Sequence, residues 1–389
     1  MGGRVSRRYA TRMVARTLVS ILSLAVAAAT QTFIVDAASG PGTNFTNIAP
    51  AVAAVPDGAV LRVRAGTYSE FAINGKSLAV LGEPGARVAC LNAGVGVVNL
   101  LPHQAVVLRG LELSAVIGMS NWGILSCYNN QGVVRLAGLR PGLGQTILSV
   151  QQCDSVFADD CTITGQTLLV ASTVVFTNCS LFGSMTGWPP AITQQGGRTQ
   201  LVGCQVYGTT TPGLPDAKGI RLNGGEVRTL GGGQIVCSAV LGSASPAIDG
   251  TGTVRLDPSV SVQGGPPLFA PGINVTVQAM PHVTATDGPL GGTSTAALHG
   301  PNGHLGVLAV GLAGPAFDVP GVFADPLFWA QGMAVTLSAG VPATGQPVTG
   351  LVAIPGNPVF AGLQLLYQGI TWEAAAGLQI SNPAVGVVR

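Results

Sequence analysis

The sequence predicts an all-β chain, with a right-handed parallel β-helix followed by a smaller β-sandwich-like domain. Three observations favour this fold class: a short repeated phrase, a composition rich in turn-forming residues, and the loss of the phrase near the C-terminus. The phrase places small or apolar residues at offsets 0, 2, 5 and 7, so two stretches of strand alternation flank a break that requires a corner. Its clearest copies are Val156-x-Ala158-x-x-Cys161-x-Ile163, Val174-x-Phe176-x-x-Cys179-x-Leu181 and Thr199-x-Leu201-x-x-Cys204-x-Val206.

The copies begin 18 and then 25 residues apart, a spacing typical of a solenoid whose units bury their apolar faces against neighbours. A further full copy lies at 106–113, and weaker copies lie at 134–139, 224–235 and 254–262, of which 224–235 is interpreted as a coil with a looped-out corner. Together the copies predict about eight coils. An α-helical alternative is disfavoured because no long segment has apolar residues at i, i+3, i+4 and i+7. Valine, isoleucine, threonine and glycine are also poor helix formers.

Composition supports the same class. The 389 residues include 56 glycines and 26 prolines, which suits a chain that turns every few residues. Mean hydropathy is +0.48, but no uninterrupted apolar run of 18 residues follows residue 30, so the body is expected to be soluble. Only 9% of residues are charged, and the formal net charge of +2 owes much to the first 16 residues. Nothing in this balance indicates nucleic-acid binding.

Residues 1–29 have the features of a bacterial export signal. Five arginines precede the apolar run Thr17–Ala29, which is too short to span a bilayer comfortably and ends in small residues suited to cleavage. We therefore expect a secreted or cell-surface protein with no membrane association beyond this segment. An uncleaved membrane anchor is the alternative.

Residues 30–265 are predicted to form the β-helix, capped at its N-terminal end by a short helix. Ile48, Val52 and Val55 share one helical face, which can cover the open end of the solenoid. A strand, this helix and a coil closing at Gly66-x-Tyr68-x-Glu70 follow in order. This arrangement resembles the N-terminal entry of pectinesterase-like members of the pectin-lyase-like β-helix family. We interpret Glu70 as a backbone-bonding corner residue rather than a catalytic one.

The seven cysteines show no C-x-x-C spacing, so a zinc site is not expected. Cys161, Cys179 and Cys204 occupy the same position of the phrase and should stack inside the solenoid about 4.8 Å apart. We predict buried thiols. A disulfide between stacked neighbours is the alternative and would need a particular torsion angle.

Residues 266–280 are predicted to be a linker, because they contain Pro266-Pro267 and Pro271-Gly272. Residues 281–389 then show separate strand-like runs divided by glycine and proline, which is typical of a β-sandwich. These runs are Leu305–Leu312, Ala334–Leu337, Val348–Ile354, Leu363–Tyr367 and Leu378–Ile380. Short motifs such as Ile354-Pro355-Gly356-Asn357-Pro358 and Leu378-Gln379-Ile380-Ser381-Asn382 resemble a C-terminal module that recurs in exported bacterial proteins.

The coils contain one acidic cluster, formed by Asp154, Asp159 and Asp160. β-Helix enzymes that act on polysaccharides need clustered carboxylates, but the equivalent corners of the next coils carry no acid. The Gln-Asp pair that a pectinesterase resemblance implies is also missing, and the sequence suggests no matching acid for Arg198 or Arg221. We therefore interpret the cluster as a solvated corner and assign no catalytic, cofactor-binding or metal-binding residue, and no cofactor.

The favoured hypothesis is an exported, non-catalytic β-helix protein that binds carbohydrate or another cell-surface partner. One alternative is a polysaccharide lyase, hydrolase or esterase that uses the three aspartates. Another is a structural surface or spacer protein attached through its C-terminal domain. Trp122, Tyr128 and Trp188 are interpreted as loop residues that pin loops to the coil wall, with stacking on sugar rings as the alternative.

Overall fold

The computed structural model describes residues 31–91, 93–115, 124–142, 147–183, 190–208, 218–237, 245–319, 322–323, 325–342, 346–360, 362–374 and 377–388. Contacts divide the described chain into two compact units, one of Thr32–Ala279 and one that begins at Met280.

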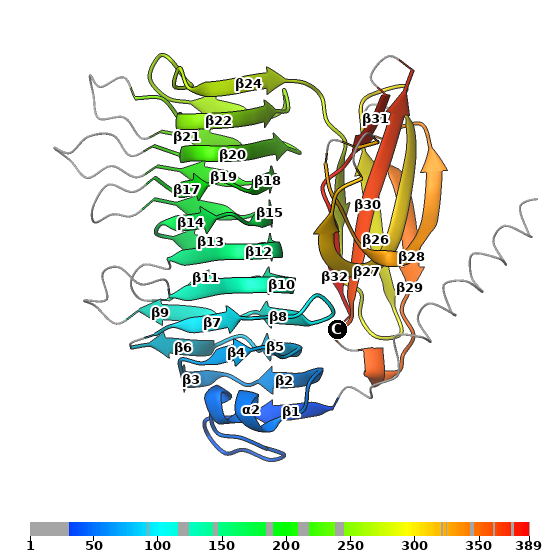
Figure 1. Cartoon of the computed structure of the whole chain (residues 1–389). Helices are drawn as coiled ribbons and strands as arrows, with labels where there is room; N and C mark the ends of the chain where they lie inside the picture. Colours follow the sequence, from blue (N-terminus) through cyan, green and yellow to red (C-terminus); the bar gives the residue numbers. More distant parts are fainter. Residues whose placement is uncertain are drawn as a thin grey trace, which may run out of the picture. The chain divides into compact units, whose positions relative to one another are not determined.

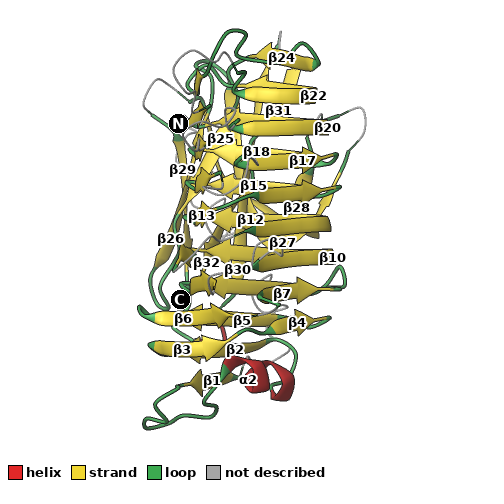
Figure 2. Ribbon diagram, turned by 90° about the vertical axis from the view of Figure 1, so that its left-hand side faces the viewer, coloured by secondary structure: helices red, strands yellow, loops and turns green. Residues whose placement is uncertain are grey.

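The first unit is a parallel β-helix of about eight turns, and its strands stack as rungs in Figures 1 and 2. The largest sheet contains β1 (Thr32–Val35), β2 (Ala59–Val63), β4 (Ala72–Asn74), β5 (Leu78–Gly82), β7 (Val95–Val98), β8 (Ala105–Arg109), β10 (Leu125–Ala137), β12 (Leu148–Asp159), β14 (Thr167–Val170), β15 (Thr173–Thr177), β17 (Ile192–Gln195), β18 (Arg198–Val202), β20 (Ile220–Leu230), β22 (Ile248–Leu256) and β24 (Ile273–Val277). A four-stranded sheet contains β3 (Gly66–Ser69), β6 (Ala86–Cys90), β9 (Glu112–Ala115) and β11 (Arg140–Pro141). A five-stranded sheet contains β13 (Thr162–Thr164), β16 (Ser180–Phe182), β19 (Gln205–Tyr207), β21 (Gln234–Val236) and β23 (Ser261–Gln263).

The predicted stacking of the repeated phrase is confirmed residue by residue. Val156 on β12 pairs with Val174 on β15, and Val174 pairs with Thr199 on β18. The last position of the phrase forms a second column on β13, β16 and β19, where Ile163 pairs with Leu181 and Leu181 with Val206. All these side chains are buried, so the phrase marks the apolar axis of the solenoid.

Corners of the β-helix repeat a left-handed backbone conformation, which explains their glycine and asparagine content. One column of corners has positive φ at Gly75, Asn99, Asn129, Gln152, Ala171, Gly196 and Gly224, and another at Gly110, Gly138, Asp160, Asn178, Gly203 and Gly231. Glycine adopts this conformation without strain, and asparagine and aspartate tolerate it better than other residues. Ala171, with φ of 45°, is the residue in these columns that is least suited to its corner.

Replacing Ala171 with glycine is therefore expected to stabilise the protein by about 1 kcal/mol, because the Cβ strain of a left-handed residue is removed. The free energy of urea-induced unfolding measures this change. Ala158→Gly is the control, since Ala158 lies buried within β12 and its replacement should destabilise by roughly 0.5–1 kcal/mol. Destabilisation by Ala171→Gly would contradict the corner assignment.

The capping helix is also confirmed. Helix α2 (Ile48–Ala54) lies at the β1 end of the stack and buries Ile48, Ala51 and Val52, with Val55 buried just beyond its end (Figure 1). Lys76 closes the C-terminal end by donating to the carbonyl oxygen of Val52 at 2.8 Å. A cation at this position satisfies helix carbonyls that have no partner within the helix.

All seven cysteines are buried thiols, as predicted for the stacked three. Burial raises the pKa of Cys161 and of Cys179 well above the usual thiol range, and raises the pKa of Cys90 to about 11. Each stacked thiol also lies within 3.5 Å of backbone carbonyl oxygens of its own and the preceding coil. These thiols fill space in the solenoid interior and are poorly reactive.

Iodoacetamide at pH 8 is accordingly expected to modify essentially no thiol in the folded chain and all seven after denaturation, because the thiolate is the reacting species. Mass spectrometry counts the added groups. Fewer than seven modifications in denaturant without reductant would indicate disulfides instead, and rapid labelling of folded protein would contradict the burial.

The second unit consists of two antiparallel sheets around one core. One sheet contains β25 (His282–Ala285), β26 (Thr293–His299) and β29 (Val348–Ala353), and the other contains β27 (Leu305–Phe317), β28 (Leu327–Gly340), β30 (Gln364–Glu373), β31 (Gly377–Ile380) and β32 (Ala384–Val387). The short 3-10 helix η1 (Pro358–Phe360) precedes β30. The Tyr367 hydroxyl on β30 joins the two sheets through a 2.6 Å hydrogen bond with Ser294 on β26. Burial of the Tyr367 side chain raises the pKa of Tyr367 to about 12. This two-layer core agrees with the sandwich-like domain that the sequence predicts.

The segment 266–280 is not simply the predicted linker. It contains β24, which pairs in parallel with β22 and adds a further rung to the β-helix. The alternation Ile273-x-Val275-x-Val277 marks this strand, but the surrounding prolines and glycines mask it in the sequence.

Candidate functional site

The three aspartates of the acidic cluster occupy structurally different places. Asp159 ends β12 and its carboxylate lies 3.3 Å from the guanidinium of Arg135, which is fully buried on β10. Asp160 occupies a left-handed corner, with φ of 49°, and its carboxylate lies 2.7 Å from the guanidinium of Arg140. Asp154 is exposed on β12, although partial burial of its carboxyl raises its pKa. Two of the three acids are therefore held by arginines of the preceding coil.

Glu70 has the backbone-bonding role that the sequence predicts. Its carboxylate oxygen Oε2 accepts hydrogen bonds from the backbone N–H groups of Leu91, Ala93 and Gly94, at 2.9, 3.1 and 3.1 Å. A carboxylate that gathers three backbone donors stabilises the turn that follows β6. The Oε2 atom of Glu70 is therefore occupied by hydrogen bonds to this turn.

The strongest candidate surface is an outward-facing polar ladder on consecutive coils. It consists of alternate residues of β10, β12, β14, β17, β20 and β22, which point away from the buried core because side chains alternate along a strand. One column is Ser126, Ser149, Leu168, Thr193, Arg221 and Asp249, of which Thr193 is only 7% exposed. The other is Tyr128, Gln151, Val170 and Gln195, continued by Asn223, which follows the Gln194–Leu222 pair, and its partner Thr251. We call this set the outer ladder.

Hydrogen bonds to members of the outer ladder order its side chains. The Gln151 amide donates to the Ser149 hydroxyl at 3.0 Å, and the amide of Gln166, just before β14, donates to the Thr193 hydroxyl at 3.1 Å. Tyr128 is 47% exposed, so a large part of its ring is open to solvent. The result is a row of hydroxyl and amide groups beside an exposed aromatic ring, with successive rungs about 4.8 Å apart.

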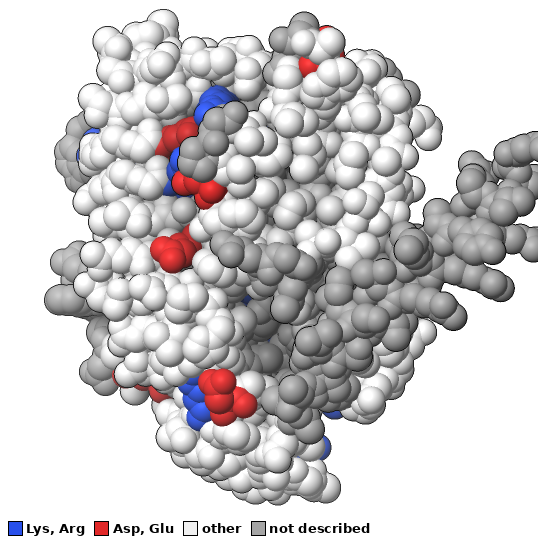
Figure 3. Space-filling view, turned by 45° about the vertical axis from the view of Figure 1, so that its right-hand side comes forward, with Lys and Arg blue, Asp and Glu red and all other residues white. Residues whose placement is uncertain are grey.

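The β20–β22 end of the outer ladder carries a charge cluster of two cations and one acid. The Asp249 carboxylate contacts the Lys218 ammonium and lies 3.7 Å from the Arg221 guanidinium. Burial alone would raise the pKa of Asp249, but the hydrogen bond and positive charge of Lys218 outweigh it and hold that pKa below its usual range. In the view of Figure 3, charged side chains form small, separate groups on a mostly uncharged surface, and some of these groups contain both signs.

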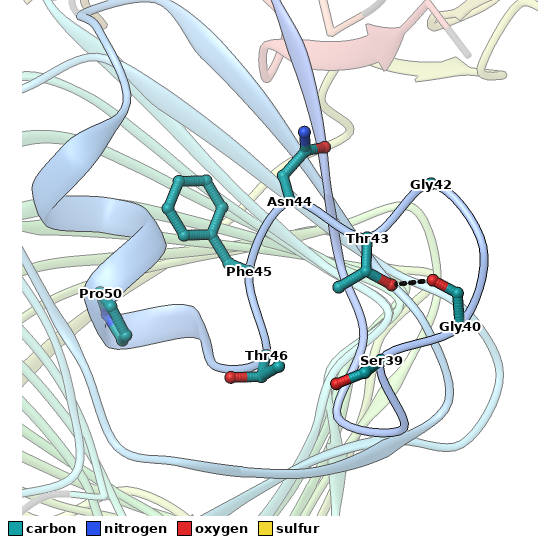
Figure 4. Close-up of a pocket in the computed structure, with 8 residues that line it drawn as sticks. All are labelled: Ser39, Gly40, Gly42, Thr43, Asn44, Phe45, Thr46 and Pro50. Carbon is teal, nitrogen blue, oxygen red and sulfur yellow. Dashed lines mark hydrogen bonds between the residues drawn. The ribbon is translucent and has the colours of Figure 1, made fainter.

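A hollow of about 460 Å³ lies in the connection between β1 and α2 (Figure 4). It is lined by Ser39, Gly40, Gly42, Thr43, Asn44, Phe45, Thr46 and Pro50. Its polar side chains shape the loop itself: the Asn44 amide oxygen accepts from the Ile34 N–H at 2.8 Å, and the Thr43 hydroxyl donates to the Gly40 carbonyl at 2.5 Å. No carboxylate, imidazole, amine or thiol lines this described hollow to activate its hydroxyl groups, so we assign it no chemistry.

Asp36 organises this loop from its buried position. Its carboxylate accepts from the Ala38 and Gly40 N–H groups and pairs with the Arg64 guanidinium at 2.8 Å. The hydrogen bond from Arg64, followed by those from the backbone, holds the pKa of Asp36 below its usual range. A carboxyl whose folded pKa is depressed stabilises the folded state at pH values above its unfolded pKa of about 3.9, and loses that contribution as pH falls through the folded pKa.

Asp36→Asn should therefore destabilise the protein at pH 7, and the difference from the wild type should shrink at pH 3. Urea unfolding at the two pH values measures it. Glu83→Gln, which breaks the exposed Arg62–Glu83 pair, is the control and should change stability by less than about 1 kcal/mol. An Asp36→Asn effect of equal size at both pH values would argue against the ion pair as its source.

The two arginines for which the sequence suggested no acid do have acidic neighbours, which corrects that interpretation. Arg198 pairs in register with Glu226 one coil later, and Arg221 likewise pairs with Asp249. The Arg221 guanidinium lies 3.7 Å from the Asp249 carboxylate. Both pairs could have been found by aligning positions at the coil period.

The structure also corrects the placement of one aromatic residue. Tyr128 lies on β10 instead of in a loop. Trp122 and Trp188, the other two aromatics interpreted as loop residues, lie outside the described residues.

Among the described residues, no helix has the length and apolarity needed to cross a membrane. Nor does the described part of the chain gather three or more histidine, cysteine or acidic side chains in an arrangement suited to a metal ion. No family model matches the chain, and searches of curated proteins and of solved structures found no match either.

Proposed function

We propose that the protein is an exported, non-catalytic β-helix protein that binds an extended polysaccharide along the outer ladder. The observation that supports this most is the ladder's side-chain chemistry: eight of its twelve residues carry a hydroxyl or an amide, although the β14 rung is apolar, with Leu168 and Val170. Such groups can both donate to and accept from sugar hydroxyls. A regular row of them suits a regular polymer better than a compact ligand.

The exposed ring of Tyr128 adds an apolar face of the kind on which a pyranose ring packs. The charges of Lys218, Arg221 and Asp249 sum to only +1, which suits an uncharged or weakly charged chain. A nucleic acid would instead require several cations directed at phosphates. The N-terminal resemblance to pectinesterase-like β-helix proteins, which act on polysaccharides, points to the same class of ligand.

The contacts of Glu70 and of two of the three cluster aspartates support binding without turnover, whereas Asp154 is exposed on β12. Asp159 and Asp160 contact arginines, and Oε2 of Glu70 accepts three backbone N–H groups. A hydrolase or lyase requires carboxylates directed at the substrate. These side chains instead stabilise corners and turns of the solenoid.

Affinity electrophoresis of the purified chain through gels containing a panel of neutral and acidic polysaccharides tests the proposal. We expect retardation by at least one polymer, with no new reducing ends, no released ester groups and no unsaturated products after prolonged incubation. Release of any of these products would identify an enzyme instead. Absence of retardation by every polymer would reject polysaccharide binding and favour the spacer hypothesis.

A further inference from the structure

The three-stranded sheet of the second unit brings two histidines into direct contact. His282 on β25 is the cross-strand partner of His299 on β26, and both side chains are partly exposed. Their ring centres lie 4.6 Å apart and their planes differ by 6°. Directly opposite residues of an antiparallel pair project from the same face, so both imidazoles belong to one surface.

We infer that His282 and His299 form a two-histidine site for a divalent copper, nickel or zinc ion. This inference does not depend on the proposed polysaccharide binding. Two imidazoles that share one ion through bonds of about 2.0–2.1 Å place their ring centres roughly 4.5–5 Å apart, close to the separation in the structure. Rotation of a histidine ring about χ2 costs little, so both rings can direct a nitrogen at the ion.

The surroundings favour such a site in two ways. The backbone beside His282 is held rigidly, because the buried Asn382 amide accepts from the N–H of Val283 and donates to its carbonyl, each at 2.8 Å. The next pair on the same face, Thr284 and Ala297, has short side chains that line an open hollow of about 370 Å³. Water can therefore complete the coordination shell.

The choice of ion and of pH for a test follows from imidazole chemistry. A neutral imidazole is the form that ligates metals. Among imidazole-binding divalent ions, Cu²⁺ binds most tightly and is the best probe. Because protons compete for the same nitrogens, affinity should fall by more than about tenfold between pH 7 and pH 5.

The test is a titration of the full chain, prepared without a polyhistidine tag, with Cu²⁺ at pH 7. We expect one equivalent to bind with an electron paramagnetic resonance spectrum showing two coordinating nitrogens. His282→Gln and His299→Gln should each weaken binding at least tenfold and lose the two-nitrogen signature. His103→Gln, which alters an exposed histidine on the β-helix, should change neither.

His282→Ala and His299→Ala, checked by circular dichroism for folding, repeat the test in case a glutamine disturbs the sheet. A spectrum without two nitrogens in the wild type, or one that persists in the double variant, would overturn the inference. Polysaccharide retardation should be unchanged in every histidine variant, so failure of this site and failure of the proposed function are separately visible.

Discussion

Phe176→Ala is expected to destabilise the protein by about 3–5 kcal/mol, as is typical when a buried phenylalanine is truncated. Phe176 is fully buried on the axis of the β-helix, where its backbone pairs with Ala158 in the preceding coil and Leu201 in the next. Its large ring stands beside the small Ala158, so the neighbours cannot fill the space that truncation would leave. Chemical denaturation followed by circular dichroism gives the free energy of unfolding.

Phe182→Ala is the matched control, because Phe182 lies on β16 with its ring on the outer side and stacked against Tyr207 at 5.4 Å. Loss of this partly exposed stacking should lower the free energy of unfolding by only about 0.5–1.5 kcal/mol, in addition to the contribution of the apolar area that the ring buries. Equal effects of the two substitutions would mean that Phe176 does not lie in the interior.

Gly197→Ala is expected to be the second strongly destabilising substitution and to lower the free energy of unfolding by roughly 3 kcal/mol or more. Gly197 has φ of 75°, and a Cβ atom there would lie 2.3 Å from the carbonyl oxygen and 2.5 Å from the backbone nitrogen of Ser172. The side chain would thus have to displace the backbone of the adjacent coil, in addition to the strain of a left-handed alanine.

The neighbouring Gly196 separates these two contributions. It also has a left-handed backbone, with φ of 70°, but a Cβ atom added there would meet nothing within 4 Å apart from its own chain neighbours. Gly196→Ala should therefore cost only about 1–2 kcal/mol, the strain of the backbone conformation. If Gly197→Ala lowered the free energy of unfolding no more than Gly196→Ala, the coils would not approach each other closely at Gly197.

The repeated phrase was sufficient to predict the fold of the first unit because each position has a physical cause. Val156, Val174 and Thr199 share one buried column, and the residues between the two halves of each phrase form a left-handed corner. The interpretation of Asp160 as a corner residue follows from the same reasoning. It occupies the position that asparagine takes at Asn178 and glycine takes at Gly203.

The second unit was less predictable because its strands have no repeat to reinforce them. The runs beginning at Leu305 and Val348 were found as strands, whereas β25, β26 and β32 were not predicted. Short strands rich in alanine and threonine give a weak hydrophobic alternation. The contact of His282 with His299 depends on which strands pair, and sequence spacing does not reveal that pairing.

The outer ladder was missed for a related reason. Its members are ordinary polar residues, such as Gln151 and Gln195, whose common face emerges only once the register between coils is known. An enzyme would be expected to stack acids from coil to coil, whereas most of the ladder residues are amides and hydroxyls. Tyr128 was likewise assigned to a loop because it precedes the Val134–Leu139 copy of the phrase, whereas β10 begins at Leu125 and contains both Tyr128 and Val134.

The most direct test of polysaccharide binding compares two triple variants on whichever polymer retards the wild type. Tyr128→Ala, Gln151→Ala and Gln195→Ala together remove one ring and two amides from the outer ladder, while Tyr207→Ala, Gln205→Ala and Gln234→Ala remove the same groups from β19 and β21. We predict that the first triple weakens binding at least about tenfold and that the second leaves it unchanged, because one ring contact and two hydrogen bonds contribute roughly 2–3 kcal/mol. Undiminished binding by a folded outer-ladder variant, or equal loss in both, would contradict the account.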